Sequence, residues 1–366
     1  MAQSDVSQIK TTGIDISNLG EVKKCVDTEL RHYFTERKKQ AASIHENYVR
    51  LWDAAEATAL AGGKRLRPYL FLLTYQAYGG DITPQVIKQS LVWELMHISL
   101  LMHDDIIDRD FVRHGSSNAA GIYKVHYQKH LKNSSDVTHF SNSAALLAGD
   151  LLLMDAQNII HESSANSQDA QILGHYFQQA YFEVAGGELI DVESAFLPIG
   201  DIDSELINRY KTTSYSFLGP IVSAARLAQA EEDQILKLTN LSELCGYAFQ
   251  LRDDILGVFG DTETTGKSTS SDIEEGKRTK LLLNSYTKTD AAGRKLLESL
   301  GATELANKDI EKVRQIILKT GAKEEVVQLI HNCSTEAKEL LNQLTIDDSF
   351  KDIYRSLIDR LSGRQN

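Results

Sequence analysis

The sequence is poor in proline and cysteine. Only 4 prolines and 3 cysteines occur in its 366 residues. So few prolines permit many long helices, because a proline in a helix interior breaks the hydrogen-bond ladder. Cys25, Cys245 and Cys333 lie far apart and form no CxxC pair. The sequence therefore predicts neither a disulfide framework nor a zinc site, and it fits a thiol-reducing compartment.

The sequence also lacks a net positive charge and long apolar runs. The net charge of −12 argues against a nucleic-acid partner, because nucleic-acid phosphates need a basic surface. No uninterrupted apolar run approaches the length of a membrane span. The first residues, Met-Ala-Gln-Ser-Asp, lack the basic start and the apolar stretch of a signal peptide. We therefore expect a cytoplasmic protein with no transmembrane segment.

Helical periodicity dominates the chain. Between residues 20 and 60, apolar residues recur four apart, at Val22, Val26, Leu30 and Phe34. Convincing strand alternation is absent, whereas residues 115–142 are rich in Ser, Asn and His and predict a long, mobile connection. We predict a loose tail over residues 1–18. Residues 19–366 are expected to form one all-α domain, a bundle of ten or more helices.

A first acidic cluster, His103-Asp104-Asp105-Ile106-Ile107-Asp108, ends an apolar segment. On a helix, Asp104 and Asp108 share a face. Carboxylates packed together repel one another and are costly to desolvate, so the cluster predicts a site for a divalent metal ion. A solvated acidic helix end is the simpler alternative. His103 beside Asp104 also fits a metal phosphohydrolase, but three of the further histidines that such a site needs fall in the poorly patterned connection.

A second acidic cluster begins at Gln250-Leu251-Arg252-Asp253-Asp254 and continues to Asp261. Gln250 lies one helical turn before Asp254, and Asp261 lies seven residues after it on the same face. An acidic patch at a helix C-terminus is the alternative, and the helix dipole would disfavour it. Two clusters of the same type strengthen the metal interpretation of each.

Basic residues accompany both clusters. Gly62-Gly63-Lys64-Arg65-Leu66-Arg67-Pro68 predicts a glycine-led loop at a helix start, which is a natural anion site. Arg113 follows the first cluster, Lys211 opens Lys-Thr-Thr-Ser-Tyr-Ser, and Lys267 and Lys277 follow the second cluster. Each alone is more often a surface cation. Together with the acids they indicate a metal-bridged anion, such as a diphosphate, that is held from several sides.

These segments resemble the trans-type polyprenyl diphosphate synthases, of the farnesyl and geranylgeranyl diphosphate synthase type. Order and spacing agree over roughly residues 60–285. The matching segments are Gly62–Pro68, Glu94–His97 leading to Asp104–Asp108, Ala148-Gly149-Asp150, Lys211-Thr212, Phe249–Asp254, and Gly266-Lys267 through Asp272 to Lys277. The resemblance implies an all-α isoprenoid synthase type I fold around a central cavity, and a homodimer.

The resemblance also implies a role for each matching residue. Two groups of aspartates would bind Mg²⁺ on either side of an allylic diphosphate: Asp104, Asp105 and Asp108, and Asp253 and Asp254. Arg113, Lys211 and Lys267 would hold that diphosphate, and Lys277 would belong to the same substrate-binding set. Lys64, Arg67 and His97 would bind isopentenyl diphosphate. Thr212 and Gln250 would face the developing carbocation.

Four features depart from the family pattern. The second motif has Gly257 where many members have a third aspartate, so Asp261 is expected to help through water. Arg113-His114 replaces an Arg-Arg pair, and Gly187-Glu188 replaces a Gly-Gln pair. The 116–142 connection is longer than usual. None of these removes a part that the chemistry requires.

Product length is predicted from the helix that precedes Asp104. Leu100 lies one turn deeper and Met96 two turns deeper on nearly the same face, with Ser99 beside them. Positions 99 and 100 carry no bulky aromatic residue that would stop the chain early, and Met96 closes a pocket of moderate depth. We therefore expect geranylgeranyl diphosphate. Chains of C25 or more and farnesyl diphosphate are the alternatives, and the same residues could instead be ordinary core.

Two other functions are weighed against chain elongation. A non-catalytic subunit of such an enzyme is one, and the loss of either acidic motif would have indicated it. A terpene cyclase or a head-to-head condensing enzyme is the other. The Gly-Gly-Lys-x-x-Arg loop disfavours both enzymes, because neither uses isopentenyl diphosphate.

Overall fold

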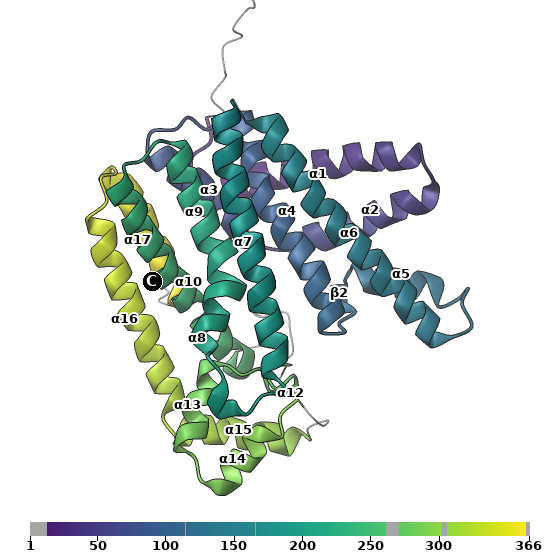
Figure 1. Ribbon diagram of the computed structural model, residues 1–366, viewed down its shortest axis with the longest axis vertical. Helices are drawn as coiled ribbons and strands as arrows, with labels where there is room; N and C mark the ends of the chain where they lie inside the picture. Colours follow the sequence, from purple (N-terminus) through teal and green to yellow (C-terminus); the bar gives the residue numbers. More distant parts are fainter. Residues whose placement is uncertain (1–12, 114, 165, 261–270, 302–305, 364–366) are drawn as a thin grey trace, which may run out of the picture. The chain divides into compact units, whose positions relative to one another are not determined.

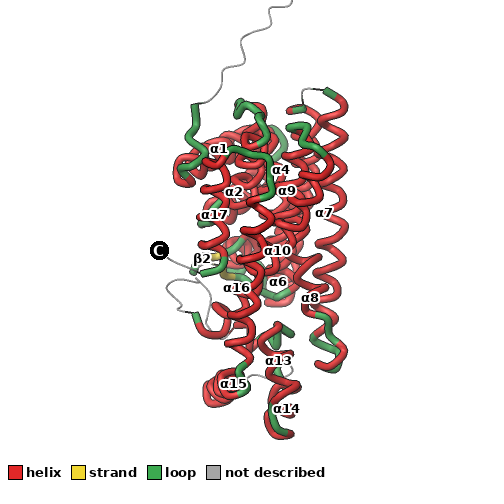
Figure 2. Tube along the Cα trace, turned by 90° about the vertical axis from the view of Figure 1, so that its left-hand side faces the viewer, coloured by secondary structure: helices red, strands yellow, loops and turns green. Residues whose placement is uncertain are grey.

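The computed structural model describes residues 13–113, 115–164, 166–260, 271–301 and 306–363. These residues are almost entirely helical (Figure 2), which confirms the predicted all-α class. In the described part of the chain the only strands are β1 (Val112–Arg113) and β2 (Ser116–Ser117), which pair with each other. Internal contacts divide the chain into two compact units, and the division falls inside helices α7 (Ser167–Ser194) and α9 (Gly219–Leu227). That residues 19–366 form one domain stays a prediction.

The first unit covers Met1–Phe111, Ser117–Tyr176 and Ser223–Ala230. Its helices are drawn in purple to teal in Figure 1: α1 (Leu19–Ala42), α2 (Glu46–Leu60), α3 (Leu66–Ala77), α4 (Pro84–Ile107), α5 (Ala119–Tyr127) and α6 (Ser134–Ser163). The four residues of the predicted α1 stripe are all fully buried. Helix α4 packs against α6, and Gln89 Nε2 donates to Ser163 O over 3.1 Å. Helix α4 is buried on several faces, because α1, α3 and α5 also contact it.

The prediction of a mobile connection over residues 115–142 was wrong. Helix α5 and the first turns of α6 occupy most of this segment. The polar residues that weakened its helical pattern are helix caps, since Asn118 accepts from Gly121 N over 2.8 Å and Asn133 accepts from Ser135 N over 2.9 Å. Tyr127 and Phe140 then join the two helices through an edge-to-face contact with ring centroids 4.8 Å apart.

Helix α6 is long and apolar enough to cross a membrane by length and composition, and 44% of its most apolar stretch is buried. The core helix of a water-soluble protein meets the same criterion. The absence of a membrane span therefore stays a prediction.

The second unit covers Val112–Ser116, Phe177–Val222 and Glu231–Asn366. Its elements beyond β1 are η1 (Ile199–Asp201), α8 (Ser204–Ile207), the π-helix η2 (Asn208–Leu218), α10 (Glu232–Phe259), α12 (Ser271–Glu274), α13 (Lys280–Lys288), α14 (Ala291–Glu298), α15 (Asn307–Lys319), α16 (Ala322–Asn342) and α17 (Asp348–Leu361). Helix α10 packs against α16 and η2. Leu251, Val258 and Val326 lie in its main apolar core, so the other faces of α10 are available for polar chemistry.

Candidate active site

The first acidic cluster lies in the last turn of α4, in the first unit. Asp105 is 2% exposed, while Asp104 and Asp108 are half-buried. The helix ends here because Asp108 is its C-terminal cap, with its backbone N–H donating to Asp104 O over 2.8 Å. Carboxylates at a helix C-terminus face the negative end of the helix dipole, so this position favours a cation among them.

The Gly149-Asp150 pair of α6 lies against this cluster. Asp150 Oδ1 is 3.4 Å from Nε2 of His103, the residue before Asp104. A Cβ atom at Gly149 would lie 2.3 Å from the same nitrogen. A side chain at position 149 would therefore displace the imidazole of His103 from its place beside Asp150.

The glycine-led loop of the same unit has two kinds of cation. Lys64 is exposed and Arg67 is half-buried, as is His97 on α4. Arg65 differs, because its guanidinium is 4% exposed and contacts acids: its Nε lies 2.7 Å from Asp27 Oδ1, and its Nη1 lies 2.7 Å from Glu94 Oε1. Although burial lowers the pKa of Arg65, these carboxylates raise it overall. Arg65 is thus a structural cation that joins the loop to Asp27 of α1 and Glu94 of α4.

The residues predicted to set product length differ in their surroundings. Met96 and Ser99 are fully buried, and Leu100 is half-buried. The Ser99 hydroxyl donates to Gly149 O over 2.8 Å, so it fastens α4 to α6. The role of all three in chain length stays a prediction.

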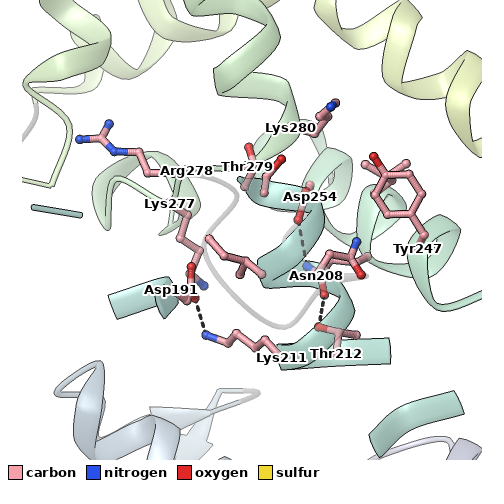
Figure 3. Close-up of a pocket in the computed structure, with 14 residues that line it drawn as sticks. Asp191, Asn208, Lys211, Thr212, Tyr247, Asp254, Lys277, Arg278, Thr279 and Lys280 are labelled. Atoms are coloured by element: carbon pink, nitrogen blue, oxygen red, sulfur yellow. Dashed lines mark hydrogen bonds and ion pairs between the residues drawn. The ribbon is translucent and has the colours of Figure 1, made fainter. Parts of the chain in front are cut away.

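The second acidic cluster lies on α10, in the second unit, where Asp253 is exposed and Asp254 is buried. Gln250 Nε2 donates to Asp254 Oδ1 over 2.9 Å, as their spacing of four residues predicts. Thr212 Oγ1 of η2 donates to Gln250 Oε1 over 2.8 Å. The chain Thr212–Gln250–Asp254 thus joins three of the predicted site residues in one hydrogen-bonded row (Figure 3).

The pKa of Asp254 is raised to about 8, mainly by burial. The nearby carboxylates of Asp272 and Asp253 contribute to this rise, whereas the hydrogen bond from Gln250 and the charge of Lys277 oppose it. The group is therefore costly to ionise in the absence of a cation. This is the electrostatic signature of an oxygen-rich site that a positive ion stabilises.

Lys211 lies beside this row, in the π-helix η2. Its Nζ is 2.5 Å from Asp191 Oδ2 and 3.0 Å from Glu188 Oε2, and Figure 3 shows it pointing toward Asp191. A Cβ atom at Gly187 would lie 2.3 Å from the backbone nitrogen of Lys211. Gly187 therefore lets α7 approach η2 closely enough for the next residue, Glu188, to reach the lysine. π-Helices are rare in proteins overall, and those that occur are often found at functional sites.

These residues line one pocket of about 100 Å³ in the second unit. Lys277, at the chain turn before α13, also lines this pocket, and it contacts Asp272 Oδ1 at 3.4 Å and Glu275 Oε2 at 3.0 Å. Asp191 and Asp272 were not predicted as site residues, because neither lies at a helical spacing from the lysine that it contacts. Arg113 is half-buried in β1. The predicted Lys267 and Asp261, and the departure at His114, lie outside the described residues.

Known proteins resemble this chain over most of its length. A family model described as polyprenyl synthetase matches residues 49–317. A short chain isoprenyl diphosphate synthase of Methanocaldococcus jannaschii is 29% identical over 294 residues, which cover 80% of each chain. A geranylgeranyl diphosphate synthase of Saccharolobus solfataricus is 30% identical over 75% of this chain and 79% of its own. The crystal structure of a geranylgeranyl pyrophosphate synthase from Corynebacterium glutamicum, complexed with isoprenyl diphosphate and magnesium, matches 95% of this chain and all of its own, with a TM-score of 0.89 and 28% identity.

Proposed function

The chain belongs to the polyprenyl synthetase family and is a trans-prenyltransferase, and we propose that it condenses isopentenyl diphosphate with an allylic diphosphate in a Mg²⁺-dependent reaction. The observation that carries the proposal is the row Thr212–Gln250–Asp254 with Lys211 beside it. It brings an anion-binding cation, two polar groups and a buried acid into one pocket. In the proposed active state the two acidic clusters hold the two sides of one diphosphate.

The acidic clusters fit magnesium. Their donors are carboxylate oxygens, and the raised pKa of Asp254 is that of an acid in need of a cation. Among the described residues, no three acidic, histidine or cysteine side chains form a ready-made metal cage. Mg²⁺ is usually held by one or two carboxylates and by substrate phosphates, so a complete cage is not required. The residues that would hold it are Asp104, Asp105, Asp108, Asp253 and Asp254.

When bound, Mg²⁺ would neutralise the charge that develops on the leaving diphosphate. Lys211, Arg113 and Lys267 would hold the diphosphate of the allylic substrate, with Lys277 in the same pocket. Lys64, Arg67 and His97 would bind isopentenyl diphosphate. Cations that are held in place before bond cleavage stabilise the transition state without reorganisation, and the contacts of Lys211 with Asp191 and Glu188 hold its ammonium group in this way.

Carbon–carbon bond formation follows cleavage of the allylic C–O bond. The double bond of isopentenyl diphosphate attacks the allylic cation, and a proton is then lost to the released diphosphate. Thr212 and Gln250 would face the cation with their oxygen atoms. The hydrogen bonds from Thr212 to Gln250 and from Gln250 to Asp254 support this role, because they hold the amide of Gln250 in one orientation. Water must be excluded, because it would quench the cation.

We propose geranylgeranyl diphosphate as the main product. Met96 is fully buried two turns before Asp104, where it would close the cavity for the growing chain, and Leu100 lies between them. Leu100→Phe should shorten the product, because the aromatic ring would block the chain one turn earlier. An unchanged product length in this variant would remove α4 as the ruler and leave farnesyl or C25 and longer products open.

We also propose a cytoplasmic homodimer. Large apolar side chains are exposed seven residues apart on α6, at Leu147 and Met154, and on α7, at Phe182 and Leu189. Residues seven apart lie on one face of a helix, so each pair forms part of an apolar stripe that a second copy would cover. Light scattering of the purified protein should give twice the monomer mass. Met154→Glu and Phe182→Glu should favour the monomer.

The proposed activity is tested with purified protein, isopentenyl diphosphate and each allylic primer in turn, with the products separated by chain length. We expect elongation with Mg²⁺ and none after chelation. Asp104→Asn and Asp253→Asn should each abolish most of the activity without loss of the fold. No elongation by the folded wild-type protein with any primer would instead favour a non-catalytic subunit.

A further inference from the structure

Gly257 leaves a space on α10 that another carboxylate fills. It lies three and four residues after Asp254 and Asp253, so it shares their side of the helix. A Cβ atom at Gly257 would lie 1.9 Å from Oδ2 of Asp272, which is far closer than any non-bonded contact allows. The Asp272 carboxylate therefore occupies the position that a side chain at 257 would take.

Asp272 is held firmly in this position. It belongs to α12, its side chain is 16% exposed, and Oδ1 lies 3.4 Å from Lys277 Nζ. The backbone N–H of Lys277 also donates to Asp272 O over 2.9 Å, which closes the turn after α12. Gly276 within that turn has a φ of +70°, and a Cβ atom there would lie 2.6 Å from Leu300 O. The turn is thus packed against backbone and cannot shift without cost.

We propose that Asp272 is the third carboxylate of the second acidic cluster, that it helps to hold the divalent cation of the diphosphate, and that Gly257 is the residue that admits it. This inference rests on the proposed function. The charges of Asp253 and Asp272 both repel the buried carboxylate of Asp254, and Lys277 offsets only part of this repulsion. A cation among the three acids would relieve the rest. Asp272 thus provides the third carboxylate that α10, with Gly257 at this position, does not supply.

The test compares two isosteric variants that each remove one acid from Lys277. Asp272→Asn removes the carboxylate next to Gly257, whereas Glu275→Gln removes the carboxylate 3.0 Å from Lys277 and leaves Asp272 in place. The readout is Mn²⁺ binding in the presence of inorganic pyrophosphate, followed by electron paramagnetic resonance. We expect about 10- to 100-fold weaker Mn²⁺ binding for Asp272→Asn and unchanged binding for Glu275→Gln.

A positional exchange completes the test. Asp272→Gly should weaken Mn²⁺ binding, and adding Gly257→Asp should restore most of it, because the acid then comes from α10. Gly257→Ala alone should act like Asp272→Asn, since its methyl group displaces the carboxylate. Unchanged Mn²⁺ affinity in Asp272→Asn, an equal loss in Glu275→Gln, or no recovery in the exchanged variant would each overturn the assignment.

The two proposals can fail separately. If the wild-type protein elongates prenyl diphosphates but Asp272→Asn binds Mn²⁺ normally, only the role of Asp272 is wrong. If the wild-type protein elongates nothing, the proposed function is wrong. The Mn²⁺ measurements then decide on Asp272 alone, because they require no catalysis.

Discussion

Arg65→Met should destabilise the first unit strongly. The guanidinium is 4% exposed and donates to three acceptors, Asp27 Oδ1, Glu94 Oε1 and Ala59 O, over 2.7–2.8 Å. Methionine fills a similar volume but donates no hydrogen bond. The variant therefore leaves the Glu94 carboxylate buried at 2% exposure. Its second oxygen, Oε2, already has no hydrogen-bond partner among the described residues.

The expected loss follows from that uncompensated charge. Removing one partner of a buried ion pair costs about 3–5 kcal/mol. For a unit of this size, this corresponds to a drop in Tm of about 6–20 °C. Asp27 is affected less, because it keeps its contact with Lys23. In Arg65→Met/Glu94→Met the stranded charge is gone, so the double variant should regain about 1–4 kcal/mol over the single one.

Thermal and urea unfolding of the single and double variants measure this. Lys38→Met is the control, because Lys38 also pairs with two acids, Glu56 at 2.6 Å and Asp53 at 3.2 Å, but at a more exposed position. It should cost at most about 1 kcal/mol. Midpoints are compared rather than free energies, since a chain with two units need not unfold in one step. A double variant less stable than Arg65→Met would refute the argument from stranded charge.

Three further predictions concern the candidate active site. Gly187→Ala places a methyl group 2.3 Å from the Lys211 backbone nitrogen, so it should cost about 1–3 kcal/mol in urea unfolding and lower kcat/KM by about 100-fold. In Gly149→Ala the added methyl group meets the ring of His103, which can rotate away, so the variant should keep the wild-type Tm. Because His103 precedes Asp104, the displaced ring should disturb the first acidic cluster and raise the Mg²⁺ concentration needed for half-maximal activity. Metal-free protein should become less stable as pH rises from about 4 to 8, because folded Asp254, with its pKa of about 8, holds a proton that the unfolded chain releases near 3.8. Urea midpoints across that range should show this decline in the wild type and a smaller one in Asp254→Asn.

Local spacing predicted much of the fold and part of the site. The stripe Val22, Val26, Leu30 and Phe34 became the buried face of α1, because apolar residues four apart can serve only one side of a helix. The same rule placed Gln250 one turn from Asp254, and the two side chains are hydrogen-bonded. Such predictions succeed where both partners lie within two turns of one helix.

The segment 115–142 shows where this reasoning fails. Its Ser and Asn residues lower helix propensity in an interior, yet at Asn118 and Asn133 they are the caps that start helices. The same residue type therefore carries opposite information at different positions. A helix as short as α5 shows too little periodicity to reveal which meaning applies.

The charge state of the pocket could not be read from the sequence either. Its lysines are recognisable as cations, but the partners of Lys211 come from α7, and those of Lys277 are identified only by the fold of the turn after α12. Four carboxylates contact two of them: Glu188 and Asp191 beside Lys211, and Asp272 and Glu275 beside Lys277. Around Lys211 and Lys277 alone, four carboxylates outnumber two ammonium groups, so a bare diphosphate meets repulsion at these two lysines. Divalent cations bound to the diphosphate would offset this excess of negative charge. Each lysine could then replace its contact with a carboxylate by a contact with a phosphate at little electrostatic cost. We therefore expect the lysine partners Glu188 and Asp191, as well as the aspartate motifs, to contribute to the proposed requirement for a metal ion.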